Sequence, residues 1–397
     1  MSTALTQTGS ESRGAAVAPS HRTRVAYLNQ AGHDAGGAER TLATFLAQHP
    51  RDLMPSAILF EDGAFADELR SLDVDVHVIG APKRLMRAKR ERIGVGAVLA
   101  VPRLVLAVAS ALRRAKIDVI YTNSMKAHVI GALAGRLIGV PCIMHFHDLI
   151  QGRGLRLLRI AARYGSARRI ACSQLVASAI GVAPTTVIYG PIELARYDAL
   201  PSRTEARRLL GIDLALPTVA LVGRINRWKG HDRFVRIADL VNRERRANFL
   251  IVGSAMFRDA EFVPELHAMV RDRHLEQIVH FIPWVDDVRT VYAAIDVNVN
   301  CSTREPLGRS PAEAAAAGKP SVVFDDSGVA ETLVNGPASR IVPAGDEAAF
   351  ARAIVALLAD APLDEKTTAT IRQTAGRFAA GPIAEQTAGV IRSVVRA

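Results

Sequence analysis

The sequence alternates short apolar segments, which are typical of buried strands, with longer segments of helical periodicity. This alternation extends from Thr23 to Tyr189 and starts again at Thr218. Because strands that alternate with helices form parallel, doubly wound sheets, the sequence predicts an α/β protein with two Rossmann-like domains. Such folds bind ligands at the carboxyl ends of their strands, so we expect a cleft between the two sheets.

The individual elements are predicted from apolar runs and from helix start and stop signals. In the first half, strands are expected at 23–29, 56–60, 75–79, 119–121, 142–146, 169–172 and 186–189, and helices at 41–48 and 127–137. In the second half, strands are expected at 218–222, 248–252, 278–281, 297–299, 321–324 and 339–342, and helices at 231–241, 264–273, 288–294, 347–359 and 366–396. A surface helix is expected at 94–112, where Pro102 and Arg103 interrupt an apolar run and argue against a transmembrane segment.

The composition is that of a globular protein with a short polar tail. With 49% hydrophobic residues, the 397-residue chain can bury two cores. Residues 1–22 are rich in Ser, Thr, Ala and Gly and lack the apolar region of a signal peptide, so a disordered tail is expected there. Cys142, Cys172 and Cys301 form no C-x-x-C pair and are expected to be reduced, buried thiols of a cytosolic protein.

The net charge of +11 is concentrated in two segments, 83–92 and 151–169. Arg156, Arg159 and Arg163 occur at helical spacing among aliphatic residues, a pattern typical of a basic amphipathic helix that lies on anionic lipid headgroups. The alternative is an ordinary solvated helix face. Nucleic acid is not expected as a partner, because aromatic residues make up only 5% of the chain and no recognised binding motif is present.

Two carboxylates, Glu305 and Glu313, bracket a Gly-containing bend and the start of a short helix. Pro311 suits the first turn of this helix, and Gly318 suits its end. Unpaired N–H groups at the helix N-terminus suit an anionic ligand such as a phosphate. These groups lie beside Leu307, Gly308, Arg309 and Ser310. A structural alternative is a capping box, in which Glu313 reaches back to Ser310 as N-cap.

The loop after the first strand contains Gly32, Gly36 and Gly37, which permit close approach of a ligand or form a tight strand-to-helix turn. Their spacing is not G-x-G-x-x-G. An NAD-dependent oxidoreductase therefore stays only as an alternative, supported by Glu61 after the second strand.

The loop 223–232 places Arg224 and Lys229 between a strand end and a helix start, where two cations suit a diphosphate. Walker A spacing is absent, and ordinary surface charge is the alternative interpretation.

The segment His145-Phe-His147-Asp148 ends a predicted strand. From the period-two alternation of strands we expect one histidine in the core and His147 in the cleft. No third zinc ligand is evident nearby, and Asp73-Val-Asp75 leads directly into a strand, so no metal site is expected.

Several short motifs occur in the order and at the spacing of retaining glycosyltransferases. They are Gly223-Arg224 with Lys229-Gly230, Glu305-x7-Glu313 and Gly328-Val-Ala-Glu331, with supporting matches at Gly36-Gly37-Ala38-Glu39-Arg40, Phe146-His147-Asp148, Ala171-Cys172-Ser173 and Ile251-Val252-Gly253. From about residue 23 onwards the chain resembles glycosyltransferase family 4, which has the GT-B fold of two Rossmann-like domains with parallel sheets facing across a cleft. The resemblance implies an acceptor domain at 23–197, a nucleotide-sugar donor domain at 198–375, and a last helix at 376–397 that crosses back to the first domain.

The resemblance also implies the roles of the charged residues. Arg224 and Lys229 would bind the diphosphate of a UDP- or GDP-sugar, Glu313 would bind the ribose, and Glu305 would bind the sugar hydroxyls. His147 would face the transferred sugar. Together with these, the donor site would include Gly37, Ile282, Trp284, Leu307, Gly308, Arg309 and Ser310, with Ile282 and Trp284 beside the base.

The implied reaction is transfer of a hexose with retention of anomeric configuration, without a metal or other cofactor. The acceptor would be a glycan, a lipid-linked molecule or a small molecule, and the protein would be cytoplasmic and peripheral at the inner face of an anionic membrane. Arg309 departs from the family pattern, which usually has a large aliphatic residue there, and is expected to add a phosphate contact or narrow the choice of donor. A non-catalytic nucleotide-sugar-binding protein is the main alternative; a sugar epimerase or glycan phosphorylase of the same fold is a further one.

Overall fold

The structure is a computed structural model. It describes residues 22–395 apart from 31, 33–35, 82–94, 257–258, 286, 334–335 and 337–338. The expected tail at 1–22 therefore falls almost wholly outside the described residues, as does the basic segment 83–92.

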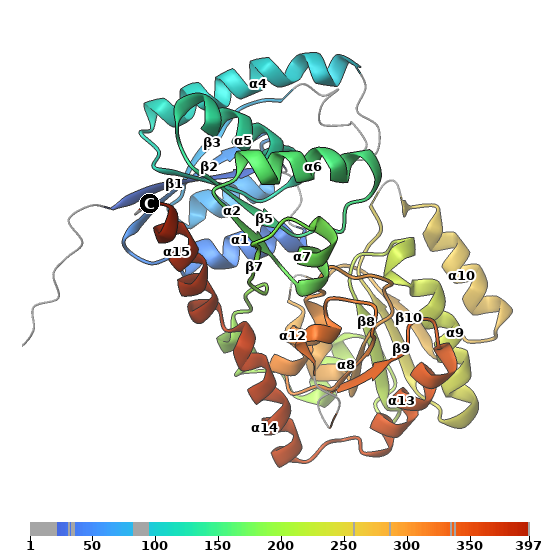
Figure 1. The fold of residues 1–397 in the computed structure, drawn as a ribbon. Helices are drawn as coiled ribbons and strands as arrows, with labels where there is room; N and C mark the ends of the chain where they lie inside the picture. Colours follow the sequence, from blue (N-terminus) through green and yellow to red (C-terminus); the bar gives the residue numbers. More distant parts are fainter. Residues whose placement is uncertain are drawn as a thin grey trace, which may run out of the picture.

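The first half of the chain forms a seven-stranded sheet in which every strand is parallel to its neighbours, in the order β3-β2-β1-β4-β5-β6-β7 (Figure 1). Its strands are β1 (Thr23–Asn29), β2 (Leu53–Leu59), β3 (Asp75–Val78), β4 (Val119–Thr122), β5 (Cys142–Phe146), β6 (Arg168–Ala171) and β7 (Thr186–Val187). The central strands β1 and β4 are buried along nearly their whole length, as expected for strands covered on both faces.

Two layers of helices cover this sheet. On one face lie α4 (Val95–Arg114), α5 (Met125–Ile138), α6 (Gly152–Gly165) and α7 (Gln174–Ile180), which share one apolar cluster. On the other face lie α1 (Gly37–Ala47), α2 (Ala64–Ser71) and, from the far end of the chain, α15 (Ala380–Val395). Among the described residues, no helix is both long enough and apolar enough to cross a membrane.

The second half forms a six-stranded parallel sheet in the order β10-β9-β8-β11-β12-β13. Its strands are β8 (Thr218–Val222), β9 (Asn248–Val252), β10 (Val279–Ile282), β11 (Val297–Asn300), β12 (Ser321–Phe324) and β13 (Ser339–Val342). One face is covered by α9 (His231–Glu244), α10 (Phe262–Asp272) and α13 (Glu347–Ala359). The other is covered by α8 (Arg203–Leu209), α11 (Arg289–Ala294), α12 (Ser310–Ala316) and α14 (Glu365–Thr374). The predicted pair of Rossmann-like α/β domains is thus confirmed.

The C-terminal helix differs from the prediction. A single helix was expected at 366–396, but α14 ends at Thr374 and α15 begins at Ala380, with a short 3₁₀ turn between them. Pro382 explains the break, because its ring would clash with the carbonyl of Phe378 in a continuous helix. The helix α1 also begins at Gly37, four positions before the expected Thr41.

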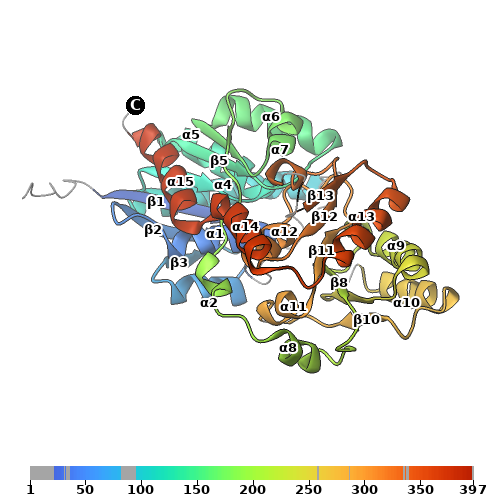
Figure 2. The ribbon, with the colours of Figure 1, turned by 90° about the horizontal axis from the view of Figure 1, so that it is seen from below.

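After this break, α15 lies against the first sheet and not against the second. Figures 1 and 2 show it beside α1 and β1, far along the chain from both. Ile383, Ala384, Ala388 and Ile391 are buried in the core of the first sheet. The guanidinium of Arg392 also binds both carboxylate oxygens of Asp52, at 2.7 and 2.9 Å. The first core is therefore completed by the end of the chain.

We predict that Ile391→Ala destabilises the protein by about 2–5 kcal/mol, because Ile391 is fully buried and its truncation leaves a cavity. Gln386→Ala on the exposed face of the same helix is the matched control and should change the free energy of unfolding by less than about 0.5 kcal/mol. Urea unfolding curves measure both. Equal effects of the two substitutions would show that α15 is not part of the first core.

Candidate active site

The cleft-facing loop after β8 is fixed by a close backbone contact. Gly230 has a positive φ of 73°, and a Cβ there would lie 2.1 Å from the carbonyl oxygen of Cys301. Only glycine lets the loop approach the end of β11 so closely. Asn226 supports the same turn, because its side chain accepts a hydrogen bond from the Lys229 amide. The side chain of Lys229 is thereby brought over the segment that carries Glu305.

Lys229 and Glu305 form an ion pair in which Nζ lies 2.7 Å from Oε2. Glu305 is only 5% exposed, so its charge depends on this partner for compensation. The backbone carbonyl of Glu305 accepts a hydrogen bond from Gly328, which holds the third loop of the site against the first two. The two residues predicted to act on the donor are thus brought together from positions 76 residues apart.

Glu313 projects from the first turn of α12 and makes two side-chain contacts. Its Oε2 accepts a hydrogen bond from the hydroxyl of Tyr292 at 3.0 Å, and its Oε1 lies 3.3 Å from Nε of Arg309. The alternative of a capping box with Ser310 is wrong, because the helix begins at Ser310 with Arg309 as N-cap and the carboxylate turns to Tyr292 instead. Tyr292 was not identified from the sequence, since it lies on another helix.

The side chain of Arg309, which was expected to contact a phosphate or narrow the choice of donor, makes two contacts within the protein. Its Nη1 donates a hydrogen bond to the carbonyl of Pro191, in the segment that joins the two sheets, and its Nε faces Glu313. The guanidinium therefore ties the carboxylate to the connecting segment.

The first sheet contributes the glycines of the loop before α1. A Cβ at Gly32 would lie 1.9 Å from the carbonyl oxygen of Glu61, so this glycine serves close packing between two loops. Gly36 lies across the cleft from Arg224, whose Nη2 would be 3.6 Å from a Cβ at Gly36. Nothing within 4 Å would obstruct a Cβ at Gly37, which faces open space. The two halves thus meet where Arg224 approaches Gly36, and Gly37, the predicted donor residue of this loop, lies next to that contact.

Glu39, two residues further on, has a structural role. Its carboxylate accepts hydrogen bonds from the Gly36 amide at 3.0 Å and from the Asn29 side chain at 3.1 Å. It therefore caps the start of α1 and holds the glycine loop against the end of β1. Burial raises the pKa of this carboxyl group.

The alternation argument predicted that His145 and His147 would point to opposite sides of the strand, and this prediction is wrong. Residues two apart along an extended chain share a face, and the two rings are tilted at 41° to each other with centroids 3.9 Å apart. His145 is buried and bonds the Tyr121 hydroxyl through Nδ1, whereas His147 is half-buried beyond the strand end and bonds Asn123 through Nε2 at 2.7 Å. His147 therefore lies just beyond the carboxyl end of β5, and its place in the cleft remains a prediction.

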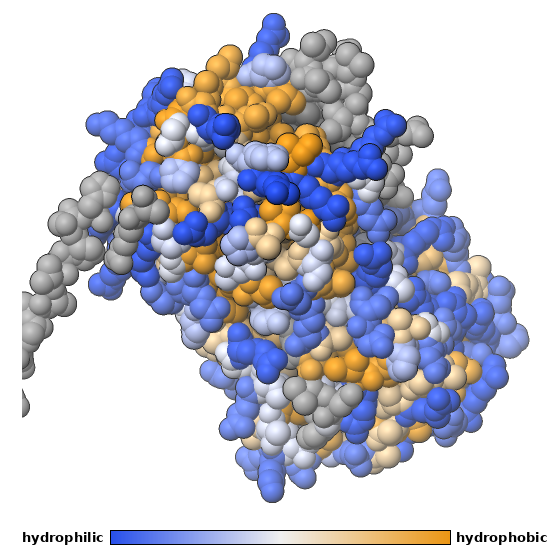
Figure 3. Space-filling view, in the orientation of Figure 1, coloured by the Kyte–Doolittle hydropathy of each residue, from blue (hydrophilic) through white to orange (hydrophobic). Residues whose placement is uncertain are grey.

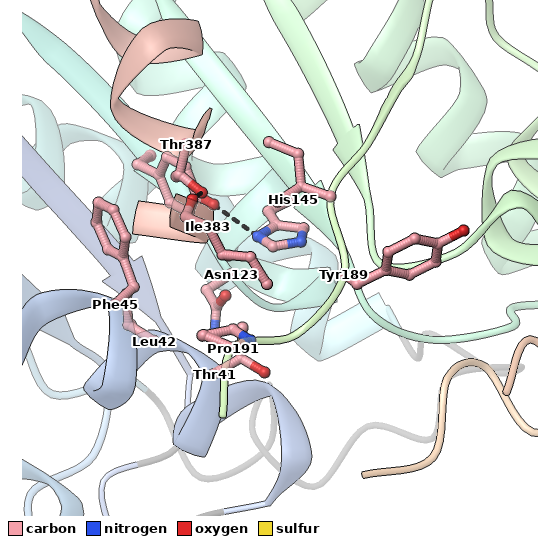
Figure 4. Close-up of a pocket in the computed structure, with 11 residues that line it drawn as sticks. Thr41, Leu42, Phe45, Asn123, His145, Tyr189, Pro191, Ile383 and Thr387 are labelled. Atoms are coloured by element: carbon pink, nitrogen blue, oxygen red, sulfur yellow. Dashed lines mark hydrogen bonds between the residues drawn. The ribbon is translucent and has the colours of Figure 1, made fainter. Parts of the chain in front are cut away.

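Asn123 was missed by sequence reasoning, although it directly follows β4 and so lies at the carboxyl edge of the sheet. It also borders a small, mainly apolar cavity beside the site (Figure 4). Side chains from α1, the strand ends, the connecting segment and α15 converge on this cavity: Thr41, Leu42, Phe45, Tyr121, Asn123, His145, Ile188, Tyr189, Pro191, Ile383 and Thr387.

The remaining predicted residues lie at the carboxyl ends of β9 and β10. Ile282 ends β10, and its carbonyl accepts a hydrogen bond from Gly253. Trp284 is 59% exposed, and its amide donates to the Ser254 hydroxyl. Both therefore border the second half of the cleft, although the indole of Trp284 is exposed to solvent.

The two halves are in direct contact beside the site. Both oxygens of the Glu331 carboxylate accept hydrogen bonds from the amides of Gln174 and Leu175, at 2.7 and 2.6 Å, at the start of α7. A Cβ at Gly328 would lie 2.0 Å from the Pro306 carbonyl and 2.7 Å from Oγ of Ser173. The Gly328-Val-Ala-Glu331 motif therefore joins the second half to the first.

Two facing parallel sheets with a charged cleft at their strand ends define the GT-B class of glycosyltransferase folds. The family model described as Glycosyl transferases group 1 matches residues 216–360, and that described as Glycosyltransferase Family 4 matches residues 64–196. The 2-deoxystreptamine N-acetyl-D-glucosaminyltransferase of Streptomyces fradiae is 30% identical over 78% of this chain and 79% of its own. The alpha-maltose-1-phosphate synthase of Mycobacterium tuberculosis is 26% identical over 81% of this chain and 91% of its own.

Among solved structures, Anabaena HepE in complex with UDP is 27% identical, with a TM-score of 0.80 over 94% of this chain and 100% of that one. A glycosyltransferase of Rickettsia africae has a TM-score of 0.81 at 16% identity and supports the fold only. The chain belongs to the group 1, family 4 glycosyltransferases. It is a glycosyltransferase with the GT-B fold, and the oxidoreductase alternative is set aside.

Three buried histidines and the half-buried His147 predict how stability depends on pH. Burial lowers the pKa of His128 to about 3, of His147 and His231 to about 4, and that of His145 well below its ordinary value of 6.5. These rings stay neutral in the folded protein, whereas the unfolded chain binds protons below about pH 6.5. The contribution of these four neutral histidines to the free energy of unfolding is therefore complete above about pH 6.5 and is lost as the pH falls towards 4.

We expect the free energy of unfolding to be lower at about pH 5 than at about pH 7.5, as measured by urea unfolding at constant ionic strength. His128→Gln, which removes one of the four groups, should reduce the difference between the two pH values. Equal stability of the wild type at both pH values would contradict the argument.

Proposed function

We propose that this glycosyltransferase moves a hexose from a UDP- or GDP-sugar to its acceptor with retention of anomeric configuration. The observation that carries the proposal is the Lys229–Glu305 ion pair, which joins the loops after β8 and β11 at the carboxyl edge of the second sheet. HepE is 27% identical to this chain, and its structure was solved with UDP and with UDP-glucose. This similarity supports a nucleotide-sugar donor.

In this proposal, residues 198–375 form the donor domain and Arg224 and Lys229 bind the diphosphate. Glu313, held by Tyr292, binds the ribose hydroxyls, and Ile282 and Trp284 border the base. The backbone of Leu307, Gly308, Arg309 and Ser310 adds phosphate contacts at the start of α12. Gly37 approaches the donor from the acceptor domain, residues 23–197, where its free space leaves room for a ligand.

The catalytic roles rest on charge. Negative charge develops on the departing diphosphate, and fixed cations at Arg224 and Lys229 stabilise it within a largely buried site. They supply the positive charge that the leaving group requires, so the proposed reaction is metal-independent. Glu305 binds the sugar hydroxyls, and His147, whose low pKa keeps it neutral, donates or accepts a hydrogen bond to the sugar without adding charge.

The acceptor in this proposal is a glycan, a lipid-linked molecule or a small molecule. In this proposal the protein is cytoplasmic and peripheral at the inner face of an anionic membrane. The basic segment 151–169 supports this location.

We expect Lys229→Ala and Glu305→Gln each to lower kcat by about 10²–10³-fold, because each removes a group that acts on the transition state. Arg227→Ala is the matched control: this cation is two residues from Lys229, but it pairs with Glu265 at the surface and is expected to retain activity within about twofold. Release of nucleotide diphosphate from a panel of UDP- and GDP-sugars measures the rates and identifies the donor. Equal rates in wild type, Lys229→Ala and Glu305→Gln would support the non-catalytic alternative.

Retention is tested separately by following the anomeric proton of the product by NMR at early times. An α-linked donor should yield an α-linked product, because the proposed front-face route delivers the acceptor from the side on which the diphosphate leaves. Initial formation of the β-anomer would refute retention while leaving the transferase assignment in place.

A further inference from the structure

Three adjacent helices of the first domain expose an unusual number of apolar side chains. Of the thirteen large hydrophobic residues that are exposed in the described part of the chain, six lie on α4, α5 and α6. They are Leu106, Leu133, Leu137, Leu157, Ile160 and Tyr164, with exposed fractions that reach 66% at Tyr164. Such clustering on a surface marks an interaction site more often than scattered exposure does.

The exposed residues of α6 form one face of the helix. Arg153, Arg156, Leu157, Ile160 and Tyr164 follow each other at intervals of one, three or four residues, and all are exposed. The opposite face, with Gly154, Leu158 and Ala162, is buried against the sheet. The outward stripe is therefore apolar and basic at once, and it is not needed for packing within the domain.

The same composition continues over the neighbouring helices. The guanidinium of Arg136 on α5 donates to the carbonyl of Tyr164 on α6, and that of Arg113 on α4 reaches the carbonyl of Leu137, so the three helices lie side by side. Their exposed arginines are Arg103, Arg113, Arg114, Arg136, Arg153, Arg156, Arg159 and Arg163. No Asp or Glu occurs within α4, α5 or α6. Figure 3 shows apolar and hydrophilic side chains interspersed over the part of the surface where Figure 1 places α4 and α6.

The combination of exposed arginines and aliphatic side chains on this face indicates which kind of partner could bind there. A second copy of the chain would place arginine against arginine across a symmetric contact, which is unfavourable. A polyanion such as a nucleic acid would satisfy the arginines but leave the leucines and Ile160 in water. An anionic bilayer satisfies both, because its headgroups attract the arginines and its acyl boundary accepts the aliphatic side chains.

We propose that the face formed by α4, α5 and α6 docks the protein on an anionic lipid bilayer and thereby selects a lipid-linked acceptor. The active site is close to this face along the chain: α6 begins at Gly152, five residues after His147. A bilayer held against α6 lies beside the acceptor side of the cleft, where an acceptor carried by a lipid has only a short distance to reach the donor. This inference rests on the proposed transferase function and narrows its acceptor.

The test compares two doubly substituted proteins that carry the same chemical changes. Arg156→Glu with Leu157→Ser alters the proposed docking face, whereas Arg208→Glu with Leu209→Ser alters an exposed Arg-Leu pair on α8 of the second domain. Flotation with vesicles of phosphatidylcholine and phosphatidylglycerol should show binding of the wild type at low salt, weaker binding at high salt, and little binding to phosphatidylcholine alone. The α6 variant should lose at least about tenfold in vesicle partitioning, and the α8 variant should bind like the wild type.

Donor hydrolysis in the absence of vesicles separates this inference from the proposed function. It should be equal in all three proteins, because neither pair lies in the cleft. The docking surface would be overturned if the wild type turned over the donor but did not bind vesicles, or if both variants lost vesicle binding equally; the transferase proposal would stay intact. The docking surface would also be overturned if the wild type did not bind vesicles but self-associated, and the α6 substitutions abolished that self-association. Absence of any donor turnover in the wild type would count against the proposed function and not against the membrane contact.

Discussion

The ion pair between Lys229 and Glu305 is the interaction on which the arrangement of the cleft depends. A carboxylate as buried as Glu305 is costly without a cation beside it, and the cation is delivered only because Gly230 allows its loop to lie against the Cys301 carbonyl. The backbone of Glu305 in turn binds Gly328. Three loops, after β8, β11 and β12, are thereby fixed relative to one another at the edge of a single sheet.

The same edge is also where the two domains are joined. The carboxylate of Glu331 binds the exposed amides at the start of α7, and the close packing of Gly328 on Pro306 and Ser173 leaves no room for a side chain between them. At the other end of the molecule, α15 completes the first core and Arg392 pairs with Asp52. The two domains are thus held facing each other by contacts outside the proposed substrate sites.

The basic residues of the chain lie in environments with different consequences. Arg224 and Lys229 lie partly buried, where electrostatic interactions are strong, and a diphosphate is their proposed ligand. The arginines of α4, α5 and α6 lie on the surface, where salt screens them and where only many charges together with apolar contacts give useful affinity. The proposed nucleotide donor and the proposed lipid surface therefore depend on separate groups of basic residues.

The sequence by itself determined the strands and the order of the elements, since β1, β5, β8, β9, β12 and β13 coincide with apolar runs that end at turn residues. It also predicted Arg224 and Lys229 in the loop between a strand end and a helix start, and Glu305 and Glu313 on either side of a bend at the start of a short helix, because turn residues and helix start signals mark these positions. It did not determine the partners of these residues. Tyr292 meets Glu313 and Asn123 meets His147 across separations of 21 and 24 residues, and the rings of His145 and His147 lie in tilted contact at the end of β5. Such contacts are decided by how helices and strands pack in three dimensions, for which local sequence carries no signal.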